Sequence, residues 1–397
     1  MTLALITLGR TALLGVSALA LACGALPRFS ADEVGCRSTV TAEGEPSSVN
    51  VRWFRVDDDR DFAFQNAWCA GVGPAVLWEA PEPQGEELLA AVDSGTAAAA
   101  NGASGTATAA TATPTSDEPV LDSLLVVAYN AHIGAGELDD LVADIRSGEL
   151  TGQPATHFVL LLQEVYREGL GVPPDSALPR DAPSGSRTSE SDRVPVVQGA
   201  QALRLHLVYV PSMRNGMGFA TAEDRGNAIL STLPLTDPRA LELPAGIQRR
   251  VTVVAEVGGV TSAGNPWTVG VASAHLDNAS FSNPLASLGS VRARQASGLV
   301  RMLPREGPLV VGGDFNTWFQ QAEERAYLIM RDDFPWPRNP QAAPTAQRLG
   351  AGRTIDWIFF RGPAGWSFDD ARASHTYGSD HYPVYGWVRI PPGGYEG

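Results

Sequence analysis

Two oxygen-bearing side chains, Asp314 and Asn316, follow an apolar run in the stretch LVVGGDFNT at residues 309–317. The run predicts a buried strand, and two glycines separate it from the polar pair. α/β enzymes place much of their chemistry at the carboxyl ends of strands, where carboxylate and amide oxygens can bind a cation or orient water. For an isolated Asp-x-Asn, an Asx turn with a purely local role is the alternative. The rest of the chain has to distinguish the two.

Other apolar runs are also accompanied by side chains that bind metals or transfer protons. In chain order these are Asn130, Glu164, His275, Asp314 with Asn316, Asp356, and Asp380 with His381. Singly, each has a structural explanation as a cap, a solvated strand end, a core histidine or a turn residue. Recurrence at six predicted strands favours one shared site.

The candidate metal ligands are carboxylate and amide oxygens, and no cysteine or histidine cluster accompanies them in the sequence. Hard oxygen donors favour Mg²⁺, Mn²⁺ or Ca²⁺ over Zn²⁺. The sequence therefore predicts a divalent cation as cofactor, with Mg²⁺ first, Mn²⁺ as its substitute, and Ca²⁺ as a further option.

The composition removes several classes of mechanism. The 397 residues carry a formal net charge of -15, which argues against a protein that coats nucleic acid by neutralising phosphates. All 29 cationic side chains are arginine, because the sequence contains no lysine. A phosphate-binding loop with its lysine, a lysine Schiff base and a Ser/Lys hydrolase dyad are therefore excluded. A nuclease that holds one scissile phosphate with a few arginines and a cation is not excluded.

The amino terminus resembles an export signal. Residues 1–22 contain Arg10, then an uncharged run that ends in small residues. Cys23 follows directly and resembles the lipidated cysteine of bacterial lipoproteins; a free cysteine in a removed segment is the alternative. We expect an exported protein: periplasmic, attached to the cell surface as a lipoprotein, or secreted. If Cys36 and Cys69 pair in an oxidising compartment, Cys23 is the one left over.

Composition also divides the chain. After the signal, residues 23–93 form an amino-terminal accessory region, which we expect to pack against the main domain. Residues 94–117 are almost entirely Ala, Thr, Gly and Ser and predict a flexible linker. The catalytic domain is predicted at residues 118–397. Within it, the Pro- and Ser-rich residues 173–195 predict a long mobile loop beside the site.

The catalytic domain contains more predicted strands than helices, and some neighbouring strands look hairpin-connected. This pattern favours an α/β fold with two packed, mostly antiparallel β-sheets flanked by helices, which is a four-layer sandwich. Predicted helices cover residues 137–145, 288–302 and 323–330. Predicted strands cover residues 124–129, 158–162, 205–210, 227–231, 250–257, 267–274, 355–360 and 384–390, in addition to the strand before Asp314.

The motifs around these candidate residues, together with Gly226-Asn227 and Gln163-Glu164, occur in the order found in the endonuclease/exonuclease/phosphatase superfamily. The chain resembles this superfamily, which has the fold of pancreatic deoxyribonuclease, over residues 122–390. The resemblance implies that Asn130 and Glu164 bind one catalytic cation, with Asp380 in or near its shell. Asp314 and Asn316 border a second metal position.

The resemblance also implies the proton chemistry. His381 is the acid/base or phosphate-binding candidate, and Asp356 would accept a hydrogen bond from its other ring nitrogen. His275 would donate to a phosphoryl oxygen, while Asp314 and Asn316 would orient the attacking water. His132 either faces the site or is a loop histidine without a catalytic task.

The function implied is metal-assisted hydrolysis of a phosphodiester or phosphomonoester by water. We expect a monomeric nuclease-type phosphodiesterase. The alternatives are a lipid or inositol phosphate hydrolase, working at a membrane surface if Cys23 is lipidated, and a non-catalytic binding module on the same fold. Seven arginines could bind a polyanion or form ordinary salt bridges: Arg204, Arg214, Arg225, Arg249, Arg250, Arg292 and Arg294.

Overall fold

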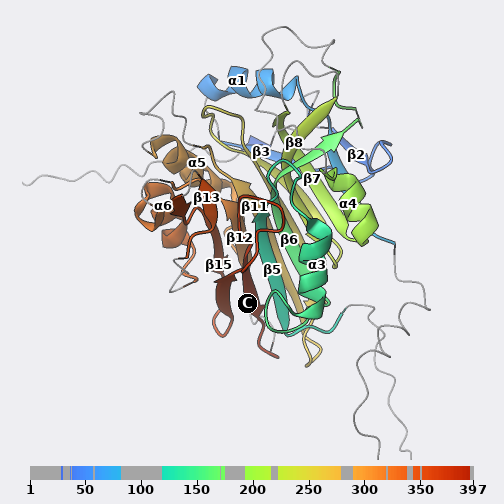
Figure 1. Cartoon of the computed structure of the whole chain (residues 1–397), viewed down its shortest axis with the longest axis vertical. Helices are drawn as coiled ribbons and strands as arrows, with labels where there is room; N and C mark the ends of the chain where they lie inside the picture. The colour runs from blue at the N-terminus through green and yellow to red at the C-terminus, as the bar shows by residue number, and fades with distance from the viewer. Residues whose placement is uncertain are drawn as a thin grey trace, which may run out of the picture.

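Two β-sheets pack face to face in the computed structural model (Figure 1). The structure describes residues 28–29, 36, 38–56, 59–81, 119–169, 171–174, 193–215, 222–278, 289–318, 321–337, 343–348 and 351–393. The predicted export signal, Cys23, the predicted linker and most of the predicted loop at residues 173–195 lie outside these ranges. Within them, no helix is both long and apolar enough to cross a membrane.

The first sheet has eight strands in the order β16-β17-β5-β6-β8-β7-β4-β2. Neighbours run antiparallel except for the pairs β5/β6 and β2/β4. The strands are β2 (Thr39–Thr41), β4 (Ala75–Trp78), β5 (Ser123–Asn130), β6 (Phe158–Glu168), β7 (His206–Arg214), β8 (Glu223–Ser231), β16 (Ser367–Arg372) and β17 (Val384–Arg389).

The second sheet has seven strands in the order β1-β3-β9-β10-β11-β12-β15, and only β3/β9 and β11/β12 are parallel. A short hairpin of β13 (Ala346–Arg348) and β14 (Ala351–Arg353) stands apart from both sheets. The strands are β1 (Arg28–Phe29), β3 (Arg52–Arg55), β9 (Thr236–Glu242), β10 (Val251–Val260), β11 (Pro266–His275), β12 (Leu309–Asp314) and β15 (Asp356–Arg361).

Three apolar clusters define four layers. The inner faces of both sheets share one core, which includes Val126 of β5 and Val310 of β12. The outer face of the first sheet packs against α3 (Leu138–Ser147) and α4 (Val196–Leu203). The outer face of the second packs against α5 (Ser290–Met302) and α6 (Arg325–Asp333), on the opposite side of the molecule (Figure 1). The predicted sandwich of two mostly antiparallel sheets between helices is confirmed.

Strand register aligns the candidate residues at the ends of neighbouring strands in each sheet. In the parallel pair β11/β12, His275 lies opposite Asp314, and in the antiparallel pair β12/β15, Asp314 lies opposite Asp356. In the first sheet, Asn130 at the end of β5 lies opposite Gln163 of β6. Because register fixes which side chains are neighbours, His275, Asp314 and Asp356 lie side by side although they are up to 81 positions apart in the sequence.

Strands from the amino-terminal region extend both sheets. β3 adds to β9, and β4 adds to β7. Helix α1 (Asp59–Cys69) lies between these strands in the chain, and Gln65 of this helix donates to the backbone oxygen of Leu243. We expected the region to pack against the main domain, and it also supplies backbone hydrogen bonds to strand edges that would otherwise be unpaired. Cys36 and Cys69 form a disulfide within it.

The two glycines before Asp314 allow backbone and sheets to approach closely. A Cβ atom on Gly312 would lie 2.7 Å from the Cβ atom of Ala128 in the facing sheet. Gly313 has φ +149°, and a Cβ atom there would lie 1.8 Å from the backbone oxygen of Ala274. Both positions therefore require glycine.

We predict that Gly313→Ala lowers the free energy of unfolding by roughly 1–3 kcal/mol, because β11 and β12 must separate to accept the methyl group. The measurement is urea unfolding followed by tryptophan fluorescence. Gly393→Ala is the control, since a Cβ atom at Gly393 meets nothing within 4 Å and should change stability by less than about 0.5 kcal/mol. Equal stability of the two variants would contradict this account of the close approach.

Candidate active site

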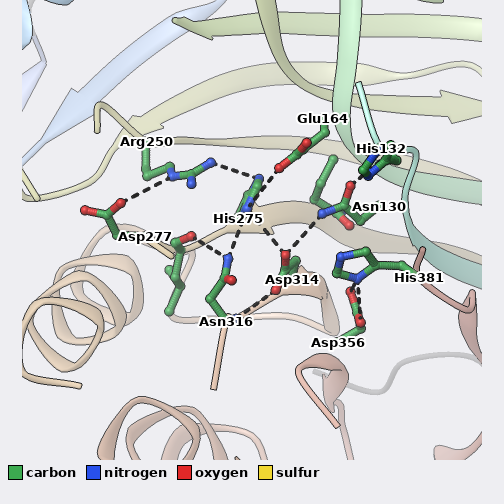
Figure 2. Close-up of polar contacts among 12 residues, drawn as sticks. Asn130, His132, Glu164, Arg250, His275, Asp277, Asp314, Asn316, Asp356 and His381 are labelled. Atoms are coloured by element: carbon green, nitrogen blue, oxygen red, sulfur yellow. Dashed lines mark hydrogen bonds and ion pairs between the residues drawn. The ribbon is translucent and has the colours of Figure 1, made fainter. Parts of the chain in front are cut away.

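The Asp314 carboxylate lies at the centre of the candidate site (Figure 2). Its Oδ2 accepts a hydrogen bond of 3.1 Å from Nδ2 of Asn130 and lies 3.4 Å from Nε2 of His275. Its Oδ1 accepts a hydrogen bond of 2.8 Å from the backbone N–H of Asn316. β5, β11 and the loop after β12 thus meet at one carboxylate, which is only 3% exposed.

Burial makes this carboxylate unusually basic. Burial and the adjacent negative charge of Asp356 raise the pKa of Asp314 from 3.8 to about 7, against the opposing effects of His381 and the Asn316 N–H. A carboxylate in this environment gains free energy by accepting a proton or a cation.

His381 and Asp356 form a buried ion pair. Nδ1 of His381 lies 3.0 and 2.9 Å from the two carboxylate oxygens of Asp356. The hydroxyl of Thr345 donates to the same carboxylate over 2.7 Å and fixes its orientation. Burial alone would lower the pKa of His381, but the charge and hydrogen bond of Asp356, followed by the charges of Asp314 and Asp380, raise it to about 10. His381 is therefore an imidazolium at neutral pH.

His275 has the opposite electrostatic environment. Burial lowers the pKa of His275 well below 6.5, and the positive charges of Arg250, Arg225 and His381 lower it further. The site thus holds one neutral and one charged imidazole, since Asp356 stabilises the charge of His381 while arginines surround His275.

Glu164 lies on a β-bulge. The predicted strand at residues 158–162 is too short, because β6 continues through Glu164 to Glu168 with a register shift between Leu162 and Val165. Glu164 has φ +53°, and the bulge turns its side chain toward the site (Figure 2). Its Oε1 lies 3.9 Å from Nε2 of His275, and its side chain is 23% exposed.

Asp380 lies at the rim of the site. Its Oδ1 lies 2.8 Å from Nδ1 of His132 and 3.7 Å from Nε2 of His381, and its side chain is 43% exposed. The hydroxyl of Ser379 donates to the backbone oxygen of Asn130 and ties this loop to the end of β5. His132, which the sequence left open, therefore faces the site through Asp380.

Asn316 is held by three contacts in the loop after β12. Its Nδ2 donates to the backbone oxygen of Leu276 over 3.1 Å and lies 3.2 Å from Nε2 of His275. Its Oδ1 accepts from Nε1 of Trp318. With φ +53°, Asn316 adopts the left-handed conformation that asparagine tolerates better than most residues.

The arginines divide by location. Arg250 reaches the site, where its NH1 lies 3.0 Å from Nδ1 of His275. Arg225 is buried within electrostatic range of Glu164. Arg249 and Arg292 instead form buried ion pairs with other structural residues, Glu242 and Glu324 respectively. The remaining three have structural contacts: Arg204 follows α4 as its C-cap, Arg214 donates to the Pro173 backbone oxygen, and Arg294 pairs with Asp61.

Sequence patterns did not identify three supporting residues. Thr345 lies outside any predicted strand, and Asp277 and Gln248 lie in connections between strands. Thr345 contacts Asp356, whereas Gln248 and Asp277 contact Arg250. Each lies 2 to 27 positions from its partner in the sequence. Polar residues in connections carry no periodic signal, so only the fold shows their role.

The donor set fits a hard divalent cation. Asp314, Asp356 and His381 each offer an atom within 4.8 Å of the others, but His381 is engaged with Asp356. The carboxylate oxygens of Glu164 and Asp314 therefore suit a cation better than this triad. Asn130 turns its Nδ2 to Asp314, while its Oδ1 accepts the backbone N–H of His132 over 3.0 Å. The Glu164 carboxylate has a 3.9 Å ion-pair contact with His275 and forms no hydrogen bond among the described residues, so its oxygens are available as ligands.

The chain is similar to known proteins over about two thirds of its length. The model of the Endonuclease/Exonuclease/phosphatase family matches residues 123–381. A UPF0294 protein of Klebsiella pneumoniae is 32% identical over 87 residues, and one of Erwinia tasmaniensis is 30% identical over 84. These stretches cover 22% and 21% of this chain and 30% of each relative. The chain thus matches less than a third of the length of these relatives.

Two solved structures are also similar. An endonuclease/exonuclease/phosphatase from Beutenbergia cavernae has a TM-score of 0.46 and 20% identity, covering 68% of this chain and 72% of that one. Sphingomyelinase C from Streptomyces griseocarneus has a TM-score of 0.36 and 14% identity, covering 67% and 99%.

We predict that Asp356→Asn lowers the pKa of His381 from about 10, because the carboxylate that raises it most is lost, while burial and the weaker charges of Asp314 and Asp380 remain. The measurement is an NMR titration of the His381 ring protons. The ion pair stabilises the fold fully below the unfolded pKa of histidine, and this contribution is lost as the pH rises through the folded pKa. Asp369→Asn removes an exposed carboxylate and should leave the titration unchanged. A His381 titration that is the same in both variants would refute the assignment.

Proposed function

Because the chain belongs to the endonuclease/exonuclease/phosphatase family, whose members act on phosphate esters, we propose that it is a divalent-metal-dependent phosphodiesterase. One observation carries the proposal: the buried Asp314 carboxylate lies within 3.4 Å of both Asn130 and His275, and within 4.8 Å of the charged His381 pair. Candidate cation ligands and proton donors therefore converge on one buried carboxylate.

Glu164, Asp314 and Asn130 would hold the cation. When bound, it supplies positive charge that stabilises a phosphoryl oxygen and the departing oxygen. We assign Asp380, at the rim, to the outer part of the same cluster. Mg²⁺ or Mn²⁺ suits these ligands, since Glu164 and Asp314 offer carboxylate oxygens and the Asn130 amide would present its Oδ1 in place of the Nδ2 that faces Asp314.

The remaining side chains orient the substrate and its protons. His275 and the charged His381 donate hydrogen bonds to phosphoryl oxygens, and such donors stabilise the charge that develops in the transition state. Asp314 orients the attacking water and accepts its proton through a carboxylate oxygen. The Asn316 amide fixes the position of His275 and of the water.

We expect Asp314→Ala and His381→Ala each to reduce hydrolysis of bis(p-nitrophenyl) phosphate by about 10²-fold or more, because each removes a proton-transfer or charge-stabilising group. The assay uses Mg²⁺ or Mn²⁺ with and without EDTA, and chelation should abolish the wild-type rate. Asp369→Ala is the matched control and should retain full activity. Near-normal rates in either site variant, with the circular dichroism spectrum unchanged, would reject the assignment.

Metal binding should release a proton. Below pH 7, Asp314 is largely protonated, so a cation that binds it must displace the proton. We therefore expect the affinity for Mn²⁺ to rise by up to about tenfold per pH unit between about pH 5.5 and 7, and to level off above that range. Calorimetry in buffers of different ionisation enthalpy measures the released proton. The result expected for Asp314→Asn is weaker binding without proton release. An affinity of the wild type for Mn²⁺ that does not change with pH would contradict the role of Asp314.

The alcohol group of the substrate is a separate question. We favour nucleic acid, with a phospholipid or inositol phosphate as the alternative, and we propose that the protein acts after export. Parallel assays on plasmid DNA, RNA, a phosphoinositide and sphingomyelin, each with Mg²⁺, separate these substrates. Cleavage of sphingomyelin or the phosphoinositide without cleavage of DNA or RNA would reject the nuclease branch and retain the phosphoesterase.

A further inference from the structure

The tautomer of His275 is determined by its contact with Arg250. NH1 of Arg250 lies 3.0 Å from Nδ1 of His275, and both side chains are buried. A guanidinium has only N–H donors and stays protonated in proteins. Nδ1 must therefore be the acceptor, and a neutral His275 carries its proton on Nε2.

The Nε2 atom of His275 faces the two carboxylates of the candidate site. Nε2 lies 3.4 Å from Asp314 and 3.9 Å from Glu164. It also lies 3.2 Å from Nδ2 of Asn316, but that nitrogen donates to the Leu276 backbone oxygen, while Oδ1 of Asn316 accepts from Trp318. Nδ2 of Asn316 is also a donor, so both ring nitrogens of His275 face an N–H group. The guanidinium of Arg250 is the nearer donor and carries a charge, which makes its hydrogen bond the stronger one. Nδ1 therefore accepts from Arg250, and Nε2 keeps the proton. In this tautomer the Nε2–H group faces the carboxylates of Asp314 and Glu164 (Figure 2).

Arg250 is itself held in place. Its NH2 donates to Oε1 of Gln248 over 3.0 Å, and its Nε lies 4.0 Å from Oδ1 of Asp277. The other carboxylate oxygen of Asp277 accepts the backbone N–H of Ile247, which fixes the connection between β9 and β10. Asp277, Arg250 and His275 thus form a chain of contacts that ends at the site (Figure 2).

We propose that Arg250 is a positioning residue that holds His275 as the Nε2–H tautomer and so presents a hydrogen-bond donor to the phosphoryl oxygen of the substrate. This inference rests on the proposed function for its substrate and on the contacts above for the tautomer. The other tautomer would place an N–H group of His275 against the charged guanidinium of Arg250 at 3.0 Å, whereas the Nε2–H tautomer meets only the neutral amide of Asn316 at 3.2 Å. Arg250 differs in role from Arg249, whose guanidinium pairs with Glu242 away from the site.

The first test reads the tautomer in the full-length protein labelled with ¹⁵N-histidine. Long-range ¹H–¹⁵N correlation spectra distinguish a protonated Nε2 from a protonated Nδ1, and His275→Asn assigns the signal among the six histidines. We expect the Nε2–H pattern in the wild type. An Nδ1–H pattern would overturn the inference without any Arg250 variant.

The second test uses Arg250→Met, which keeps an unbranched side chain and removes the donor. We expect His275 to populate both tautomers, kcat for bis(p-nitrophenyl) phosphate to fall about 10- to 100-fold, and KM to change by less than about threefold. Arg250→Lys retains a protonated donor and should restore the tautomer and part of kcat. Arg361→Met is the control, because Arg361 pairs with Asp333 at the opposite end of β15, and it should match the wild type.

The two readouts separate this inference from the proposed function. If the wild type hydrolyses the diester while Arg250→Met keeps both its kcat and a single His275 tautomer, the positioning role fails and the phosphodiesterase stands. If the wild type hydrolyses no phosphate ester, the proposed function fails, and the delivery of a donor to phosphate fails with it. The spectra still decide whether Arg250 sets the tautomer.

Discussion

A carboxylate at the end of a buried strand has to be compensated, and the arrangement around Asp314 follows from this constraint. An isolated charge in a protein interior is expensive unless hydrogen bonds or opposite charges accompany it. Asp314 receives two N–H donors and lies near two imidazoles. Even so, its pKa stays raised. The incomplete compensation leaves a position where a proton or a cation is stabilised, which is the property that a metal-assisted hydrolase needs.

The close approach of strands makes this compensation possible. Gly312 and Gly313 allow β12 to lie against the facing sheet and against β11, and register then places His275 and Asp356 beside Asp314. The first sheet contributes Asn130 through its own parallel pair, β5/β6. Neither sheet holds the whole site, so the site depends on the packing of one sheet against the other.

Arginine takes the place of lysine throughout this sequence, and neighbouring arginines have different roles. Arg249 lies under the amino-terminal region, where its guanidinium contacts Glu242, the sulfur of Cys36 and the ring of Trp53. Arg250 points to His275. Adjacent residues at the start of a strand point to opposite faces. The pair therefore connects the segment that extends both sheets with the side chains of the candidate site.

Sequence by itself determined which residue types accompany the buried strands. Apolar runs of the right length locate β5, β11 and β12, because burial of a strand is a local pattern. The same pattern located Asn130, His275 and Asp314 at strand ends, and the family resemblance supplied the expected pairing of Asp356 with His381. The two-sheet fold followed from the number and spacing of the runs.

Tertiary structure alone decided the contacts that cross the sequence. No local signal distinguishes Arg250 from six other arginines, because the choice depends on which guanidinium lies beside Nδ1 of His275. The bulge at Glu164 and the pairing of β3 with β9 also depend on partners more than 60 residues away. Periodicity records whether a side chain is buried, but hydrogen-bond partners and strand neighbours are set by three-dimensional packing.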